Sequence, residues 1–360
     1  MAEKNVTIYG AGMSGLVAAI NLAREGYAVR VHEREPAYGG SRIFNPSLHM
    51  TPLDVDETSN YLGIDISSAF LPLTELIAYF HDRPVGFPVK GIYAVERGDR
   101  QSSLDTILYN KCRELGVEFV WESRLDKKNL EHLSADTIIA CGLDAASYRI
   151  MDLPCAIWEA WICYGPSDLN PLCWCWMDEC ITEYGYYTVA NGMYFDMLFS
   201  NGKSVSKEAL RKYQDFMYRI KGIEPRDNWR YVTGGAGVAS VKQPRLFWKN
   251  AILAGTIAGC IDPFLGFGIS GGLVSGKVAA TAVTDRAKAL AEFKRFTKLF
   301  PYMYLLKTYV WWTLIRPHVG MMERAMRLAG PKNVEKIANV FVNKRITPPI
   351  IPGYNVLGCN

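Results

Sequence analysis

The sequence predicts an α/β fold: a mostly parallel sheet with covering helices, an antiparallel sheet inserted into it, and a helical C-terminal segment. Three observations support this class. Strand and helix patterns alternate over residues 6–142 and return over residues 250–284. Short aromatic strands separated by Gly, Pro and Asn fill residues 156–198. Residues 286–345 carry a surplus of Lys and Arg. Alternating strands and helices are typical of parallel sheets, and short aromatic strands of antiparallel ones.

The first element is a strand over residues 6–9, followed by a helix over residues 16–23 and a strand over residues 28–32. The turn between strand and helix reads Gly10-x-Gly12-x-x-Gly15, and Glu33 follows the second strand. This arrangement is the fingerprint of a Rossmann-like dinucleotide-binding domain. A purely structural glycine turn is the alternative, because such turns also precede helices that bind nothing.

Each residue of the fingerprint has a physical role. Gly10 permits the tight turn, Gly12 lets the backbone approach a pyrophosphate, and Gly15 lets helix and strand pack closely. The N-terminus of the helix offers free N–H groups and the positive end of a dipole to the phosphates. Glu33 is expected to accept hydrogen bonds from a ribose.

The next loop, residues 35–42, contains Gly39 and Gly40, whose backbone can lie against a ligand. Arg42 at its end can reach a phosphate, and a plain surface turn is the alternative. Beyond this loop the hydrophobic pattern predicts one helix and then two strands, over residues 102–115, 117–121 and 135–142.

The aromatic strands of residues 156–198 predict an antiparallel sheet, and a helix is predicted over residues 207–220. The aromatic side chains could form core or line a pocket. Cys173, Cys175 and Cys180 lie in this stretch. Zinc sites need four ligands, commonly in C-x-x-C pairs, so the C-x-C spacing favours small apolar side chains along a strand over a metal site.

The α/β pattern returns with a strand over residues 250–255, followed by Thr256 and Asp262. A glycine-rich loop over residues 266–272 then leads into a helix of small residues over 273–284. A glycine loop at a helix N-terminus makes a second backbone-lined anion site. Two such sites on one sheet indicate one long ligand held at both ends.

Taken in order, the fingerprint, the Gly39-Gly40-Ser41-Arg42 loop, the strand over 252–259 and the loop over 262–268 resemble flavin-dependent oxidoreductases of the glutathione-reductase-like type. Within that type the chain is similar to the geranylgeranyl reductase group, with hydroxybenzoate-hydroxylase-like monooxygenases as cousins. The resemblance implies FAD as cofactor and NAD(P)H or a reduced protein carrier as electron donor. It implies these cofactor-binding residues: Gly10, Ala11, Gly12, Met13, Ser14, Gly15, Glu33, Arg34, Gly40, Ser41, Arg42, Arg100, Gly142, Thr256, Asp262, Gly268 and Ile269.

The chain departs from the family pattern in two places. Gly255-Thr256 replaces the usual Gly-Asp, so Thr256 would contact the ribityl chain through its hydroxyl. Residues 186–191 stand where the reductases carry a Tyr-x-Trp-x-Phe-Pro stretch in the substrate sheet. The second departure leaves the identity of the substrate open.

The resemblance implies a reductase that transfers hydride from reduced FAD to a carbon–carbon double bond of a hydrophobic, isoprenoid or lipid-like substrate. His49 is the first candidate for the proton source, and a surface-loop histidine is its alternative. An aromatic monooxygenase is the second hypothesis. A flavin-binding protein without catalysis, or an electron-transfer subunit, is the third.

The expected domains are a discontinuous FAD-binding domain over residues 1–150 and 230–285, an antiparallel substrate domain over residues 151–229, and a basic and aromatic C-terminal helical segment over residues 286–360. With 49% hydrophobic and 21% charged residues, the 360-residue chain has an ordinary globular composition. Nine cysteines without a regular framework, and a strand at the start without an apolar leader, indicate a reducing cytoplasm.

The net charge of +4 is too small to indicate a nucleic-acid partner, but thirteen Lys and Arg face three Glu over residues 286–345. Residues 299–315 are apolar and aromatic, yet Pro301 and Lys307 interrupt them, so they are too short and broken to span a bilayer. Trp and Tyr flanked by cations are typical of an interfacial helix on the inner face of a membrane. A helical cap on the sheet is the alternative. In the interfacial case four cations would face anionic lipid: Lys307, Arg316, Arg324 and Arg327.

Overall fold

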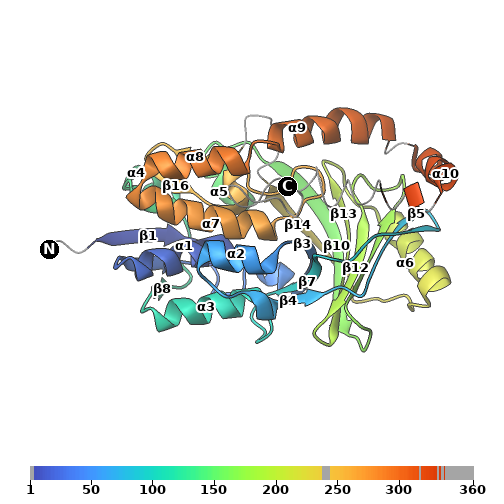
Figure 1. Cartoon of the computed structure of the whole chain (residues 1–360), viewed down its shortest axis with the longest axis horizontal. Helices are drawn as coiled ribbons and strands as arrows, with labels where there is room; N and C mark the ends of the chain where they lie inside the picture. The colour runs from blue at the N-terminus through green and yellow to red at the C-terminus, as the bar shows by residue number, and fades with distance from the viewer. Residues whose placement is uncertain (1–3, 237–243, 316–317, 331, 334–335, 337–360) are drawn as a thin grey trace.

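The computed structural model describes residues 4–236, 244–315, 318–330, 332–333 and 336. Two large sheets follow one another along the long axis of the molecule, with helices on their faces (Figure 1). The structure therefore confirms the α/β fold with an antiparallel sheet and C-terminal helices.

The first sheet has six strands in the order β15-β16-β9-β1-β2-β8. All pairs are parallel except β15–β16 at the edge. The bounds are β1 Asn5–Tyr9, β2 Ala28–His32, β8 Glu118–Val120, β9 Thr137–Ile139, β15 Phe247–Trp248 and β16 Ala251–Leu253. Ile8, Val31 and Ile138 are fully buried, as expected for a parallel sheet covered on both faces.

Six helices accompany this sheet: α1 Met13–Arg24, α2 Val55–Leu62, α3 Leu104–Glu114, α4 Lys127–Glu131, α5 Ala145–Ile150 and α7 Ile269–Thr284. Helix α1 packs against both α3 and α7. A Cβ at Gly276 of α7 would lie 2.5 Å from the Ser14 carbonyl oxygen. The two helices can therefore approach closely because position 276 has no side chain, and α7 is held next to the glycine turn.

The second sheet is mainly antiparallel, in the order β14-β10-β13-β12-β11-β5-β6. Its strands are β5 Glu75–Phe80, β6 Arg83–Gly86, β10 Ala156–Pro166, β11 Leu172–Met177, β12 Gly185–Ala190, β13 Met193–Asn201 and β14 Arg230–Ala236. Helix α6, Lys207–Lys221, covers one face. The sheet draws on more of the chain than residues 151–229, because β5 and β6 come from before that range and β14 from after it.

A small sheet, β3-β7-β4, connects the two large ones. It comprises β3 Ser47–Pro52, β4 Phe70–Pro72 and β7 Ile92–Arg97. Single 3₁₀ turns occur at η1 Arg42–Phe44, η2 Ser67–Ala69 and η3 Gly255–Ala258. Strand β3 contacts β12 and β13, so residues that follow the glycine loop are brought against the antiparallel sheet.

The C-terminal segment begins with α8, Arg286–Phe296, which packs on α7. Helix α9, Phe300–Leu305, continues into the π-helix η4, Leu306–Ile315, and α10 spans Val319–Ala329. In Figure 1 these helices follow the upper edge of the molecule from the first sheet to the second. Among the described residues, no helix is both long and apolar enough to cross a bilayer.

Candidate active site

The glycine turn between β1 and α1 has the geometry that its sequence predicts. Gly10 has φ +111°, and a Cβ there would lie 2.4 Å from the Ala140 carbonyl oxygen. A Cβ at Gly15 would lie 2.0 Å from the Gly10 carbonyl oxygen, so Gly15 allows strand and helix to pack. A Cβ at Gly12 would meet no atom within 4 Å. Gly12 thus presents open backbone to a ligand at the N-terminus of α1.

Glu33 links this turn to the end of β2. Its two carboxylate oxygens accept the N–H of Ala11 at 2.7 Å and the N–H of Glu35 at 3.0 Å. Burial raises the pKa of the Glu33 carboxyl above its ordinary value. Ala11, a predicted cofactor residue, therefore uses its N–H to position Glu33. The carboxylate is held beside the turn, where a ribose would meet it.

A cavity of about 560 Å³ extends from this turn to the antiparallel sheet. Its volume lies in the range of small-molecule and cofactor sites. Most of the predicted cofactor residues line it, together with His49: Gly10, Gly12, Met13, Ser14, Glu33, Arg34, Gly40, Ser41, Gly142, Thr256, Asp262, Gly268 and Ile269. Ala11, Gly15, Arg42 and Arg100 are not among the lining residues.

Two of the three predicted arginines, Arg42 and Arg100, lie elsewhere. The Arg42 side chain is 73% exposed and its Nε is 3.9 Å from Glu35. Arg100 is 3.3 Å from Glu96 and donates to the Asn191 carbonyl at 3.0 Å. Arg97 takes the position in the cavity instead, because it is the last residue of β7 and pairs with Ser47 of β3.

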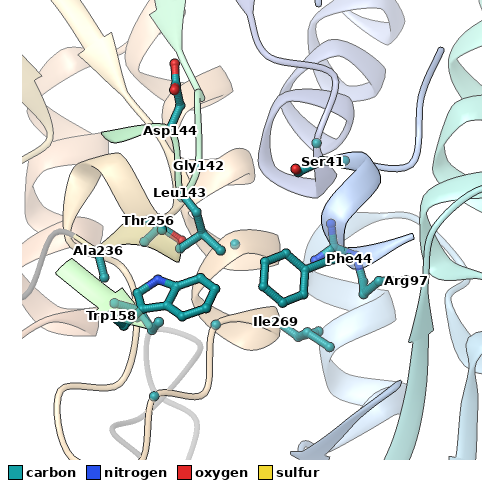
Figure 2. Close-up of a pocket in the computed structure, with 18 of the residues that line it drawn as sticks. Ser41, Phe44, Arg97, Gly142, Leu143, Asp144, Trp158, Ala236, Thr256 and Ile269 are labelled. Carbon is teal, nitrogen blue, oxygen red and sulfur yellow. The ribbon is translucent and has the colours of Figure 1, made fainter. Parts of the chain in front are cut away.

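Arg97 is held by a bidentate ion pair. Its Nε and Nη2 donate to Asp105 of α3 at 2.6 and 2.8 Å. The nearby Asp105 charge raises the pKa of Arg97 although burial opposes this. The side chain lies beside Phe44 in Figure 2. The pair fixes a guanidinium at the cavity wall, a position that the sequence pattern assigned to Arg42 and Arg100.

Polar residues gather at the end of the cavity next to β2. Asp144, the N-cap of α5, lies 2.9 Å from Arg34 and 3.0 Å from Arg124. Burial opposes ionisation of Asp144, but its hydrogen bond with Ser147 and the two arginines lower its pKa overall. Asp144 and Arg124 were not predicted from the sequence, because both lie far along the chain from the fingerprint and only the parallel sheet brings them to Arg34.

The residues predicted near the flavin ring surround the start of α7. Gly268 and Ile269, at its N-terminus, line the cavity together with Thr256. The Asp262 carboxylate accepts the Leu265 N–H, while its Oδ1 is buried without a hydrogen-bond partner. Burial raises the pKa of Asp262 to about 6. A helix N-terminus beside a cavity favours a ligand that carries negative charge.

The opposite end of the cavity is aromatic. Trp158 of β10 and Phe44 of η1 point toward one another with ring centroids 5.3 Å apart, near Leu143 and Ile269 (Figure 2). Four more residues, from the antiparallel sheet and the turn before β12, line this end: Tyr184, Tyr186, Met197 and Phe199. We call these four residues and Trp158 the aromatic wall. Other aromatic residues of the same strands, such as Trp176 and Tyr187, face α6. The aromatic residues of the sheet thus line the pocket on one face of the sheet and form core on the other face.

His49 of β3 lies at the aromatic wall. One ring nitrogen, Nε2, is 2.9 Å from the Ser47 hydroxyl, and the other, Nδ1, is 3.2 Å from the Tyr186 hydroxyl. Burial lowers the pKa of His49 to about 3. His49 is therefore a neutral imidazole at pH 7, in a hydrogen-bonded row that runs from Ser47 to Tyr186.

The C-terminal segment closes one side of the cavity. Tyr304, Lys307, Thr308 and Trp312 of α9 and η4 line it. Lys307 is buried and its Nζ lies 2.8 Å from Glu183. The expectation that Lys307 lies against anionic lipid is therefore wrong, because a buried partner already holds its charge. Arg316, expected to do the same, lies outside the described residues.

Cys173 and Cys175 share the face of β11 that lines the cavity, with their Sγ atoms 3.9 Å apart. The hydrogen bond between them, together with burial, raises the pKa of Cys175. Cys180 is half-buried beyond the end of β11. The pair thus lies as two free cysteines along one strand.

Sequence matches cover only part of the chain. Residues 8–46 match the family described as NAD(P)-binding Rossmann-like domain. A flavin-containing monooxygenase, FMO GS-OX2 of Arabidopsis thaliana, is 45% identical over 58 residues, which are 16% of this chain and 13% of that protein. FMO GS-OX-like 5 of the same organism is 32% identical over 117 residues, 32% of this chain and 26% of that protein. The chain thus matches only a small part of the length of these relatives.

Solved structures match almost the whole chain. A geranylgeranyl bacteriochlorophyll reductase-like protein of Thermoplasma acidophilum has a TM-score of 0.65 at 17% identity, covering 96% of this chain and 94% of that one. The p-nitrophenol 4-monooxygenase PnpA of Pseudomonas putida has a TM-score of 0.62 at 15% identity, covering 94% and 98%. CtdE in complex with FAD has a TM-score of 0.56 at 13% identity, covering 93% and 100%. The chain thus has an α/β Rossmann-like FAD-binding fold, which a reductase-like protein and a monooxygenase share.

Proposed function

We propose that the protein is an FAD-dependent reductase of a carbon–carbon double bond in a hydrophobic, isoprenoid or lipid-like substrate. One observation carries this proposal: a single cavity joins the glycine turn and Glu33 to the aromatic wall, and the C-terminal segment closes it. A cofactor and an apolar substrate can meet in such a cavity away from water. The similarity in fold to a geranylgeranyl bacteriochlorophyll reductase-like protein supports the choice of substrate class.

The residues present fit FAD. Open backbone at Gly12 suits a pyrophosphate, the buried Glu33 carboxylate suits a ribose, and the α7 N-terminus suits the pyrimidine edge of the flavin. When bound in its reduced form, FAD supplies the hydride. The electron donor in this proposal is NAD(P)H or a reduced protein carrier.

The chain itself would supply the proton. Because the pKa of His49 is about 3, this residue holds no extra proton at neutral pH and cannot act alone as an acid. It can pass a proton between its two neighbours, since each ring nitrogen has a hydroxyl partner. Tyr186, which lines the cavity, would then hold the proton next to the substrate.

An aromatic monooxygenase is the second candidate. The local identity with flavin-containing monooxygenases and the fold shared with a p-nitrophenol monooxygenase favour it. The aromatic wall would suit a planar substrate as well as a polyene.

An anaerobic experiment separates the candidates. The purified protein should show flavin absorbance bands, which dithionite should bleach. A reductase should then regain its oxidised spectrum without oxygen when a polyunsaturated substrate is added, and the product should gain two hydrogen atoms. Reoxidation that requires oxygen, with a product that gains an oxygen atom, would favour the monooxygenase. A protein that holds no flavin would contradict both candidates.

We also propose a peripheral contact between the C-terminal segment and a membrane. The face of α9 and η4 that points away from the cavity exposes Tyr302 (63%), Leu305 (41%) and Tyr309 (65%). Exposed cations flank this face in sequence, among them Lys298, Arg324 and Arg327. Aromatic rings with nearby cations suit the headgroup region of an anionic bilayer. A lipid-like substrate would then enter from the surface at which the protein binds.

A further inference from the structure

A buried ion pair lies in the cavity beneath the C-terminal segment. Lys307 comes from η4 and Glu183 from the turn before β12, and their charged atoms are 2.8 Å apart. Their side chains are only 8% and 4% exposed. Both residues line the cavity, next to Tyr184 of the aromatic wall. The pair therefore lies in the part of the cavity next to the aromatic wall.

Unpartnered polar atoms accompany this pair. The Thr308 hydroxyl and the Trp312 Nε1–H, from the same π-helix as Lys307, are buried without hydrogen-bond partners. Both residues line the cavity. Oδ1 of Asp262, whose carboxyl senses the Lys307 charge, is unpartnered too. Buried polar groups in folded proteins are nearly always hydrogen-bonded, so several unpaired ones at one end of a cavity indicate a polar ligand group there.

The charge of the ligand group follows from the pair. Lys307 and Glu183 already balance one another as a buried pair. An ionised group beside them would leave one buried charge without a counter-charge, which is strongly unfavourable. An uncharged group adds no charge, and it can accept from Lys307 or Trp312 and donate to Glu183.

We propose that Glu183, Lys307, Thr308 and Trp312 form a subsite, here called the lid subsite, for the uncharged polar end of an amphipathic substrate. The polar end is a hydroxyl, carbonyl or amide, and the apolar part of the molecule lies along the aromatic wall. This inference rests on the proposed function in one respect, that the substrate occupies this cavity. In this proposal, Lys307 and Glu183 determine the specificity for an uncharged polar end.

Binding to the oxidised, FAD-loaded protein tests the subsite without turnover. Farnesol, farnesoic acid and farnesylamine share one apolar chain and differ in the charge of the polar end. Each is titrated at pH about 8, where the acid is ionised and the amine protonated. The change in flavin absorbance, or in tryptophan fluorescence, reports the dissociation constant. The alcohol should bind at least about tenfold more tightly than either charged analogue.

Two single variants should change this preference in opposite directions. Lys307→Met removes the ammonium paired with the Glu183 carboxylate, so the amine should become the preferred ligand. Glu183→Gln removes the carboxylate paired with the Lys307 ammonium, so the acid should become the preferred ligand. The double variant lacks both charges of the pair and should again prefer the alcohol. It also tests the subsite where a single variant folds poorly. Lys298→Met, at an exposed cation, should leave the order unchanged.

The outcomes are distinguishable from those of the proposed reaction. Equal affinity for the three compounds, absence of binding by all three, or an order that the variants do not change would overturn the lid subsite. A protein that binds the alcohol with the expected order but does not reduce it would retain the lid subsite, and the proposed reductase activity would fail.

Discussion

At the scale of single residues, a substitution at Gly12 should impair cofactor binding without impairing folding. A Cβ at this position meets nothing within 4 Å, so Gly12→Val should fold normally but place a branched side chain where the pyrophosphate must approach. We expect its thermal unfolding to match that of the flavin-free original protein while the ratio of flavin to protein absorbance falls nearly to zero. Gly15→Val is the contrasting variant, because its Cβ would lie 2.0 Å from a carbonyl oxygen and should prevent folding. Full flavin content in Gly12→Val would show that this turn does not hold the phosphates.

His49 should make stability depend on pH in a defined direction. Its pKa is about 3 when folded and near 6.5 when unfolded, so acid protonates the unfolded chain first. Stability from the neutral imidazole is complete above about pH 6.5 and is lost as pH falls toward 3. Between pH 7 and pH 5 this loss amounts to about 2 kcal/mol. Urea unfolding at both pH values should show a difference of this size between the original protein and His49→Gln. Identical pH dependence in the two proteins would mean that His49 titrates normally.

Residue identities were predictable where the chemistry is local. The glycine turn and Glu33 could be predicted from their spacing, because both belong to one continuous βαβ unit whose fold brings them together. Arg97 could not be selected over Arg100, because the choice depends on where β7 ends and how it pairs with β3. Lys307 could not be assigned to the cavity either, since its partner Glu183 is 124 residues away.

At the scale of elements, the sequence predicted where strands and helices lie better than which strands pair with one another. Strand β2 has the predicted bounds, and α6 extends the predicted helix by one residue. The pairing of β5 with β11 joins segments almost a hundred residues apart, and no local pattern encodes it. Successive side chains along a strand face opposite sides of the sheet. This alternation explains why the aromatic residues of 156–198 are shared between the cavity and the core against α6.

The C-terminal helices give a prediction about the membrane contact. Tyr302 and Tyr309 are exposed, whereas Trp311 packs on Phe264 with ring centroids 5.6 Å apart. Tyr302→Ser with Tyr309→Ser should therefore reduce sedimentation with anionic vesicles at low salt and leave flavin content unchanged. Tyr218→Ser, at an exposed tyrosine of α6, is the control and should have no effect. A protein that does not sediment with vesicles even at low salt would contradict the membrane contact.

At the scale of the whole molecule, the cavity is made by parts that are distant in sequence. The parallel sheet supplies the glycine turn and Glu33, and the antiparallel sheet supplies the aromatic wall. The small sheet between them carries His49 and Arg97. The C-terminal segment adds the remaining side and a buried charge. This division implies that cofactor retention and cofactor shielding depend on different segments of the chain.

Truncation tests that division. Removing residues 301–360 keeps the Phe296–Phe300 contact but deletes Tyr304, Lys307, Thr308 and Trp312 from the cavity wall. The other residues named above as lining the cavity remain, so we expect the truncated protein to retain FAD. Its flavin fluorescence should be quenched more strongly by iodide, because that side of the cavity is then open to water. Removing only residues 316–360 should leave the quenching unchanged, since α9 and η4 stay in place. If the longer truncation leaves iodide access unchanged, the C-terminal segment does not shield the flavin, and its contribution to the cavity is limited to contacts with the substrate.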